Sequence, residues 1–266
     1  MTRLGLLAGL VGLAACEVPF DPRAPTDDVV ALSGYLDASA DTQWVRVELF
    51  DAVTGTSPLP LPITATLVGE GGAEAVLEQR VRPTVAGPAH LFWTTADVEP
   101  GRTYRLDVAT EAGTAVATVA TPDTAAYAVT VDSDQQSCPA VVTVAGDVDV
   151  ADVQAVFRVV RRGQVSDIRV SHAARVVRAA DGTQRVSLYF GDDARVTPGD
   201  GEIVSAQVRV SVSSDWPVEP GDTIENVLVE PTLGAEGEID GGVGFVGGVV
   251  SEWAPYVQPI APCFRL

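Results

Sequence analysis

The fold is decided by the pattern in Trp44-Val45-Arg46-Val47-Glu48-Leu49-Phe50, where apolar and polar side chains alternate. Successive side chains of a β-strand point to opposite faces, so a period of two predicts a strand with one face buried. Residues 29–36 have the composition of a preceding strand, and residues 37–41, rich in Ala, Ser and Asp, predict the turn between the two. The ordered part of the chain is therefore expected to open with two adjacent strands.

Further short strands follow at intervals of roughly ten residues, without a helical period between them. Pro100-Gly101 fits the central positions of a type II turn, after which Tyr104, Leu106 and Val108 face one way. Short strands at this spacing predict a β-sandwich of immunoglobulin or fibronectin type over residues 29–121. Its other strands are expected at residues 63–68, 75–81, 89–94 and 114–120.

The second half of the chain repeats the β pattern with longer strands. Thr121-Pro122 marks the expected boundary, so residues 122–266 are predicted to form a second antiparallel β domain. The pattern fits either a second sandwich or an open or barrel-like sheet. Strands are expected at residues 127–131, 140–144, 153–161, 165–178, 184–190, 203–213 and 224–229.

The N-terminus has the architecture of a lipoprotein signal. Arg3 precedes an apolar run over residues 4–13, and Leu13-Ala14-Ala15-Cys16 matches a lipobox. The run is shorter than the about 20 apolar residues that a permanent membrane-spanning helix needs. We therefore expect residues 1–15 to be removed and Cys16 to carry lipid. The alternative is a plain signal peptide with an incidental cysteine.

Acidic side chains dominate the composition. The chain has 36 Asp and Glu residues and 17 basic residues, all of them Arg, for a net charge of −19. A field of this sign repels nucleic acid, so we expect no nucleic-acid partner. Residues 16–28 hold several acids between prolines, which predicts a solvated tether between the lipid and the folded part.

No group of residues in the sequence predicts catalysis or a metal site. His90 and His172 each lie on a strand-like stretch without a readable nucleophile or acid beside them. Asp147, Asp149 and Asp152 could gather a calcium ion, because calcium prefers several oxygen ligands. Solvated loop acids are the simpler interpretation, as they are for the Asp pair at residues 192–193. We expect neither enzymatic activity nor a metal site.

A glycine-rich run at residues 242–247 formally matches the loop pattern of dinucleotide-binding proteins. That motif needs a preceding strand, a following helix and an acidic residue about 20 positions later. Asp240-Gly241-Gly242 is a poor strand end, and the chain reaches Leu266 before such an acid. We therefore expect no cofactor. We expect a closely packed backbone in which the glycines let neighbouring chain approach, while apolar side chains enter the core: Phe245, Val246, Val249 and Val250.

Aromatic residues in loop-like contexts are the candidates for contact with a ligand or partner. Trp216 precedes a proline, and Trp253 and Tyr256 flank Ala254-Pro255. Aromatic side chains displayed on loops can stack on sugar rings or dock a protein. Packing in the core or over the end of a sandwich is the alternative for all three.

Several loose motifs together resemble a known family. They are Cys16-Glu17 with its proline-rich tether, the opening strand at 29–36, the turn from Pro100 to Tyr104, the Thr121-Pro122 step and the glycine run at 242–248. This combination resembles two-domain outer-membrane lipoproteins of unknown function that are found near TonB-dependent transporters in Gram-negative bacteria. The resemblance implies a sandwich-like N-terminal domain and a place in surface uptake, and it implies no catalytic residues.

The expected function is accordingly a non-catalytic binding or accessory module that is lipid-anchored in the outer membrane and faces the periplasm or the cell surface. A TonB-dependent nutrient transporter is the expected partner. A structural or adhesion module of the cell envelope is the alternative. A secreted hydrolase is disfavoured, because the sequence shows no nucleophile paired with a base.

The two cysteines outside the lipobox generate a testable prediction. Cys138 and Cys263 would lie in a compartment that permits disulfides, and two cysteines without adjacent histidines fall short of the four ligands of zinc. We predict that they pair, which in the chain-entropy account stabilises the fold by up to roughly 5 kcal/mol. Mass spectrometry of native protein with and without reductant should detect the bond, and two free thiols would contradict it.

Overall fold

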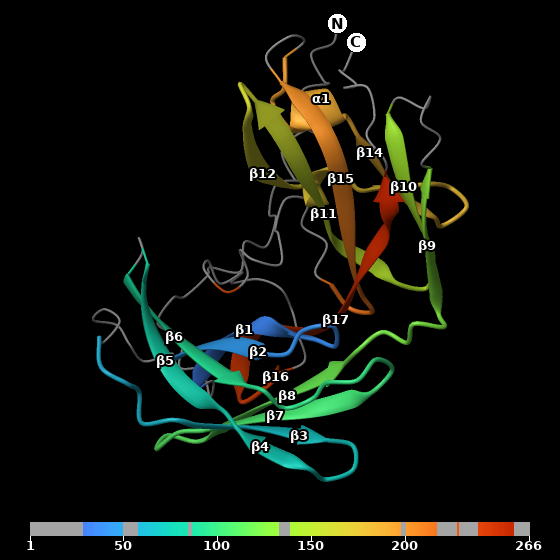
Figure 1. Cartoon of the computed structure of the whole chain (residues 1–266). Coiled ribbons are helices and arrows are strands. Elements are labelled where there is room, and N and C mark those ends of the chain that lie inside the picture. Colours follow the sequence, from blue (N-terminus) through green and yellow to red (C-terminus); the bar gives the residue numbers. More distant parts are fainter. Residues whose placement is uncertain are drawn as a thin grey trace, which may run out of the picture.

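The structure is a computed structural model, and its described residues are almost entirely β-structure (Figure 1). It describes residues 29–49, 58–84, 87–132, 139–197, 201–216, 228 and 239–257. For residues 255–257 it describes the backbone and not the side chains. The helical segments among them are the 3-10 turn η1 (Ala173–Arg175) and the one-turn helix α1 (Phe190–Asp193). The all-β class expected from the sequence is confirmed.

The strands are short in the first half of the chain and longer in the second. In chain order they are β1 (Val30–Asp37), β2 (Gln43–Leu49), β3 (Thr64–Gly69), β4 (Glu74–Val76), β5 (Glu78–Thr84), β6 (Gly87–Thr94), β7 (Thr103–Ala109), β8 (Thr114–Ala120), β9 (Tyr127–Asp132), β10 (Ala140–Gly146), β11 (Asp149–Arg161), β12 (Gln164–Ser171), β13 (Val177–Arg178), β14 (Gln184–Leu188), β15 (Glu202–Ser213), β16 (Ile239–Asp240) and β17 (Gly242–Val257).

Three sheets organise these strands. The largest has the order β12-β11-β15-β17-β1-β2-β6-β5, so it takes strands from both halves of the chain. A four-stranded sheet has the order β13-β14-β10-β9, and a five-stranded sheet has the order β16-β8-β7-β3-β4. Neighbouring strands are antiparallel except β1 and β17, which run parallel.

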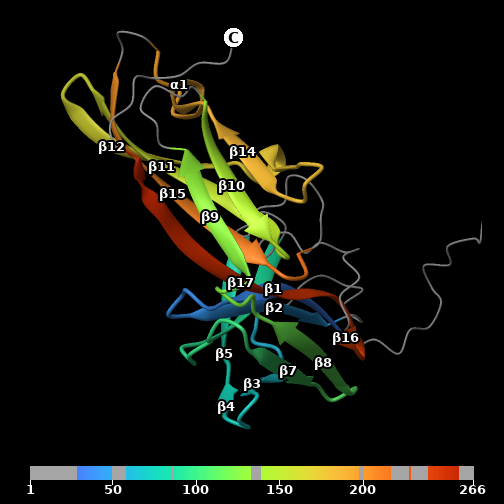
Figure 2. The ribbon, with the colours of Figure 1, turned by 90° about the vertical axis from the view of Figure 1, so that its right-hand side faces the viewer.

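Two hydrophobic cores lie on one face of the eight-stranded sheet. On β17, Val246 belongs to the first core, and Val250 and Ala254 belong to the second. Residues separated by four positions on a strand point to the same side, so both smaller sheets cover the same face (Figures 1 and 2). The first core contains Leu32, Val45, Phe92, Leu106 and Val108, and the second contains Val153, Phe157, Leu188, Phe190 and Val210.

Side-chain alternation explains why the long strands occupy the centre of the large sheet. On β15, Ala206, Val208, Val210 and Val212 are all buried in the second core. The intervening Arg209 points to the other face, where it is 35% exposed. Burying each Val side chain stabilises the fold by about 1.5 to 3 kcal/mol relative to leaving it in water.

The strands of the first half form a β-sandwich that is completed by β16 and β17 from the C-terminal part of the chain, and its turn at Pro100-Gly101 is the one that the sequence indicated. Gly101 has a φ of +69°, as the third position of a type II turn requires. The Tyr104 hydroxyl accepts a hydrogen bond of 2.7 Å from the backbone N–H of Glu99. This bond ties the start of β7 to the chain just before the turn. The second half, for which the sequence left two architectures open, forms a second sandwich on the shared sheet.

Other expectations about the second half are wrong in detail. Residues 165–178 were expected as one strand, but the chain breaks at His172 into β12, η1 and β13. The glycine-rich run forms part of β17, although its glycines hid the strand pattern. The expected entry of its apolar side chains into the interior is confirmed, since all four are at most 6% exposed. The strand expected at residues 224–229 lies outside the described residues except for residue 228.

Backbone segments come very close together where β17 meets β1 and β8. Gly244 pairs with Leu32 in the parallel register and has a φ of +108°. A methyl group at this position would overlap the carbonyl oxygen of Leu32, and one at Gly248 would overlap that of Ala120. Glycine is therefore required at both positions by contact with neighbouring backbone.

We predict that Gly244→Ala lowers the free energy of unfolding by roughly 2 to 4 kcal/mol, because it adds both a steric overlap and backbone strain. Gly71→Ala is the matched control, since a methyl group there has nothing within 4 Å and φ is not in the left-handed region. Denaturant unfolding of the two variants should separate them clearly. Equal midpoints would contradict the close approach of β17 to β1.

Candidate binding surface

The structure separates the three aromatic candidates. Trp216 is only 6% exposed, whereas Trp253 is 57% exposed. The side chain of Tyr256 lies outside the described residues, as do Cys16, Cys138 and Cys263. Trp216 thus follows the core-packing alternative, and of the three candidates Trp253 alone is shown at the surface.

The face of the eight-stranded sheet opposite the two cores is covered by no strand among the described residues. We call it the open face. Cross-strand partners place on it side chains that alternate with the core, among them Tyr35, Asp37, Trp44, Arg46, Glu48, Glu78, Arg80, Arg82, Leu91, Trp93, Arg209, Phe245, Ser251 and Trp253. It extends across strands of both sandwiches.

A buried polar cluster joins three strands at the middle of the open face. The Arg209 guanidinium donates to Asp37 Oδ2 over 2.8 Å, and the Ser251 hydroxyl donates to the same oxygen over 3.2 Å. The hydroxyls of Ser211 and Ser251 lie 2.8 Å apart. The Asp37 side chain is 5% exposed, so its charge is compensated by Arg209 and these bonds. The cluster holds β1, β15 and β17 in register.

Next to this cluster, an aromatic group explains the burial of Trp216. The Trp216 ring contacts the Tyr35 ring edge-on, with 6.4 Å between the ring centroids. It also contacts the Phe245 ring, with 5.6 Å between the centroids and an angle of 89° between the ring planes. Edge-to-face contacts of this kind add to the stabilisation from buried area. With Ala151 and Val249 the group forms a small third core on the open face.

Beyond Tyr35, the open face is hollowed into a groove of about 760 Å³, which we call the arginine groove. Trp44 lines it and is stacked on Trp93 of the neighbouring strand, with centroids 5.9 Å apart and planes at 29°. Two arginines of the edge strand β5 also line it. The full lining is Tyr35, Trp44, Arg80, Val81, Arg82, Pro83, Thr84, Ala89, Leu91 and Leu228.

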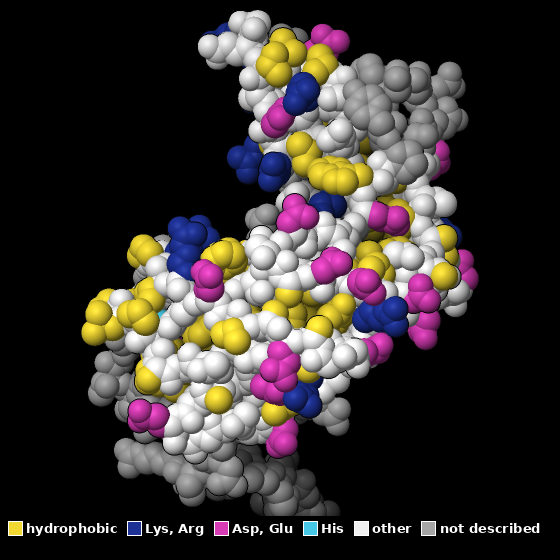
Figure 3. Space-filling model, turned by 60° about the horizontal axis from the view of Figure 1, so that its bottom comes forward, with side chains coloured by type: hydrophobic (Ala, Val, Ile, Leu, Met, Phe, Trp, Pro, Cys, Tyr) yellow, Lys and Arg dark blue, Asp and Glu magenta, His cyan; other side chains and the backbone are white. Residues whose placement is uncertain are grey.

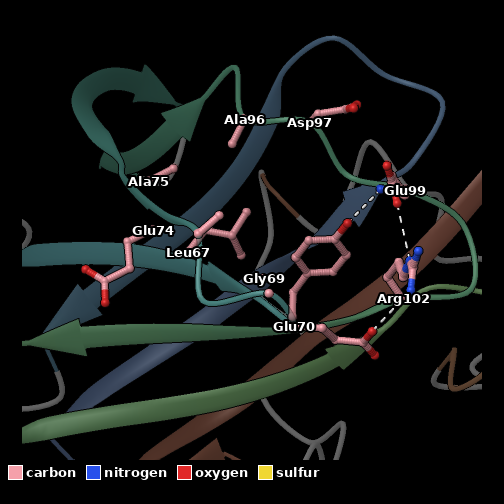
Figure 4. A pocket seen from close by; sticks show the side chains of 12 residues that line it. Leu67, Gly69, Glu70, Glu74, Ala75, Ala96, Asp97, Glu99 and Arg102 are labelled. Atoms are coloured by element: carbon pink, nitrogen blue, oxygen red, sulfur yellow. Dashed lines mark hydrogen bonds and ion pairs between the residues drawn. The ribbon is translucent and has the colours of Figure 1, made fainter.

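A second hollow, of about 520 Å³, lies beside the Pro100-Gly101 turn of the first sandwich (Figure 4). Arg102 lies there between Glu70 at 3.5 Å and Glu99 at 3.3 Å, so its charge is already compensated. Glu74 and Asp97 also line this hollow. Four carboxylates against one guanidinium make it acidic, like the chain as a whole.

The two hollows therefore differ in charge. The arginine groove has two guanidinium groups and no carboxylate among its lining residues, in a chain whose net charge is −19. No ion pair joins Arg80 or Arg82 to a carboxylate within the described part of the chain. In the view of Figure 3, acidic and arginine side chains are interspersed over the surface.

The sequence did not reveal a charged group in the interior of the second sandwich. Asp193 Oδ1 lies 2.6 Å from Arg175, and Asp193 Oδ2 lies 3.8 Å from His172 Nε2. The carboxylate also accepts from the backbone N–H of Tyr189. The expectation of a solvated turn at residues 192–193 is wrong for Asp193, whose side chain is fully buried. The feature of the sequence that could have indicated this burial is the four-residue spacing of Phe190 and Ala194, which fits one helical turn with a buried side.

The other titratable candidates also have structural partners. His90 is 1% exposed, and its Nδ1 lies 3.1 Å from Gln79 Nε2. Asp152 accepts a hydrogen bond of 2.6 Å from the Ser171 hydroxyl, and Asp149 is paired with Arg178. Within the described ranges, no group of three His, Cys, Asp or Glu side chains is placed to hold a metal ion.

Two groups near β17 have raised pKa values. Burial raises the pKa of Asp215, against the opposing hydrogen bond from Ser213. Burial, followed by the negative charge of Glu252, raises the pKa of Tyr127 to about 12. The Tyr127 hydroxyl is buried without a hydrogen-bond partner in the structure.

In the part of the chain that the structure describes, no helix is long and apolar enough to cross a membrane.

Comparison with known proteins identifies no family. No family matches the chain, and no curated protein matches it. It is similar to the structure of a pullulanase complexed with maltotriose from Anoxybacillus sp. LM18-11, with 13% identity and a TM-score of 0.24, over 69% of this chain and 24% of the pullulanase.

A DUF4785 family protein from Legionella pneumophila has 15% identity and a TM-score of 0.22, over 67% of this chain and 50% of that protein. The chain thus spans half or less of these two proteins. TM-scores at this level carry no argument about function.

The pKa of Tyr127 generates a prediction about alkaline stability. Between pH 10 and 12 the unfolded chain releases the Tyr127 proton while the folded chain keeps it. Deprotonation therefore favours the unfolded chain, and the free energy of unfolding falls as the pH rises from 10 toward 12. Tyr127→Phe should therefore lose less unfolding free energy across this window than the wild type. At neutral pH the two should agree within about 1 kcal/mol, since the hydroxyl has no partner. Denaturant titrations at several pH values test this, and parallel pH curves would contradict it.

Proposed function

We propose that the protein is a non-catalytic binding or accessory module, anchored by lipid at Cys16 in the outer membrane, that partners a TonB-dependent nutrient transporter. The observation that carries this proposal is the open face. One sheet spans both sandwiches, both cores lie on one side of it, and the other side presents exposed Trp253 and the arginine groove. A broad surface with aromatic and arginine side chains is typical of binding sites.

The surroundings of the histidines support a non-catalytic role. His90 and His172 are each 1% exposed, so a substrate in solvent does not reach either ring. A general base must lie within hydrogen-bond reach of the proton that it abstracts. The buried Asp193 beside His172 is engaged with Arg175 and backbone, which fits a role in packing.

The lipid anchor and the proposed partner are supported by the sequence. A lipobox at residues 13–16 followed by an acidic tether at residues 16–28 supports an anchor that would hold the folded part close to a membrane. The resemblance to lipoproteins found near TonB-dependent transporters suggests the partner.

The test is a pull-down of the tagged, lipidated protein in mild detergent from its own membranes, followed by mass spectrometry. We expect a stoichiometric outer-membrane barrel with the wild type, and recovery reduced about tenfold or more with Trp253→Ala, because tryptophans are enriched among the residues that dominate interfaces. Val177→Ala is the matched control, since Val177 is 64% exposed and belongs to the four-stranded sheet.

Recovery of the lipoprotein alone would contradict the transporter partnership and would favour a structural or adhesion module of the envelope. Equal recovery with Trp253→Ala and Val177→Ala would keep the partnership but remove Trp253 from the interface.

A further inference from the structure

The arginine groove has two features that together suggest a ligand: arginines without an ion-pair partner among the described residues, and a flat apolar wall. Arg80 and Arg82 are two residues apart on β5, so their side chains leave the same face of the strand about 7 Å apart. Their cross-strand partners are Leu91 and Ala89, which form the floor between them and Trp44.

The wall of the groove is pre-formed. Trp44 is held against Trp93 by stacking, and Leu91 and Ala89 are 6% and 1% exposed. A ligand that enters here meets an aromatic ring that needs no reordering. Because such rings bind flat apolar surfaces with little loss of conformational entropy, the wall favours a ligand with a ring of its own.

The charge of the groove selects the sign of the ligand. The guanidinium groups of Arg80 and Arg82 are exposed and make no ion pair with a described carboxylate. Arginine forks bind carboxylate and phosphate oxygens in pairs of parallel hydrogen bonds. A protein with a net charge of −19 repels anions at long range, so a groove whose lining holds two arginines and no acid is where an anion can approach.

We propose that the arginine groove binds a small anion whose charged group is attached to a ring with a flat apolar face, with that face against Trp44 and the anionic group on Arg80 and Arg82. The inference deepens the proposed binding function by assigning a ligand class to one part of the open face. A volume of about 760 Å³ accommodates a ligand of one to a few rings. Acidic sugars and aromatic carboxylates share this chemistry.

The test uses calorimetric titration of the purified full-length lipidated protein in detergent with two anionic probes. One is a glucuronic acid oligosaccharide, compared with a glucose oligosaccharide of the same length. The other is naphthoate, compared with naphthamide. We expect at least one anionic probe to bind and its neutral counterpart to bind about tenfold more weakly or not at all. The probe that binds shows whether the ligand is a sugar acid or an aromatic acid.

The variants place the site. Arg80→Gln with Arg82→Gln should weaken binding of the anionic probe by about tenfold or more. Arg105→Gln with Arg185→Gln is the matched control, because both arginines are exposed on strands outside the groove and the change in charge is the same. Added salt should weaken binding to the wild type.

The inference is overturned if neither anion binds, if a neutral counterpart binds as tightly, or if the groove variant binds as the wild type does. These results are distinct from failure of the proposed function. A barrel that still co-purifies while neither probe binds removes the ligand and keeps the partnership. Probes that bind while no barrel co-purifies remove the partnership and keep the ligand.

Discussion

The parallel pairing of β1 with β17 is the contact on which the whole architecture depends. Without it, the large sheet would separate into a β12-β11-β15-β17 part and a β1-β2-β6-β5 part, each with its own small sheet. The pairing requires glycine at Gly244, where the φ and the adjacent Leu32 carbonyl exclude any side chain. The Asp37–Arg209–Ser251 cluster then secures the junction with charge-assisted hydrogen bonds. Backbone approach and a buried charge pair thus join two sandwiches into one sheet.

This junction also explains why Trp253 and the arginine groove lie on the same side of the sheet. Both cores pack against the same face of the shared sheet. The side chains that alternate with the core residues therefore point to the opposite face. Trp216 folds back onto that face and buries Phe245. What remains at either side of this aromatic group is Trp253 on one flank and the arginine groove on the other.

The sequence predicted the β class, most strands of both halves and the turn at Gly101, because these depend on local alternation and turn chemistry. It did not predict β17 as a strand, since its glycines are required by contacts with strands far away in the chain. It also gave no basis for pairing Arg80 and Arg82 with Trp44, which a hairpin and a cross-strand register bring together. Of its aromatic candidates, Trp216 turned inward because Tyr35 and Phe245 offer it edge-on contacts.

The position of β17 in the chain has a consequence for how the molecule is made. Val246 completes the first core, and Val250 and Ala254 complete the second, so neither sandwich can close before these late residues have been synthesised. Contacts between β1 and β17 join residues about as distant along the chain as the described part allows, which slows folding. Until then the nascent chain exposes unfinished sheet edges. A chain built in this way stays open until its last described strand has been made.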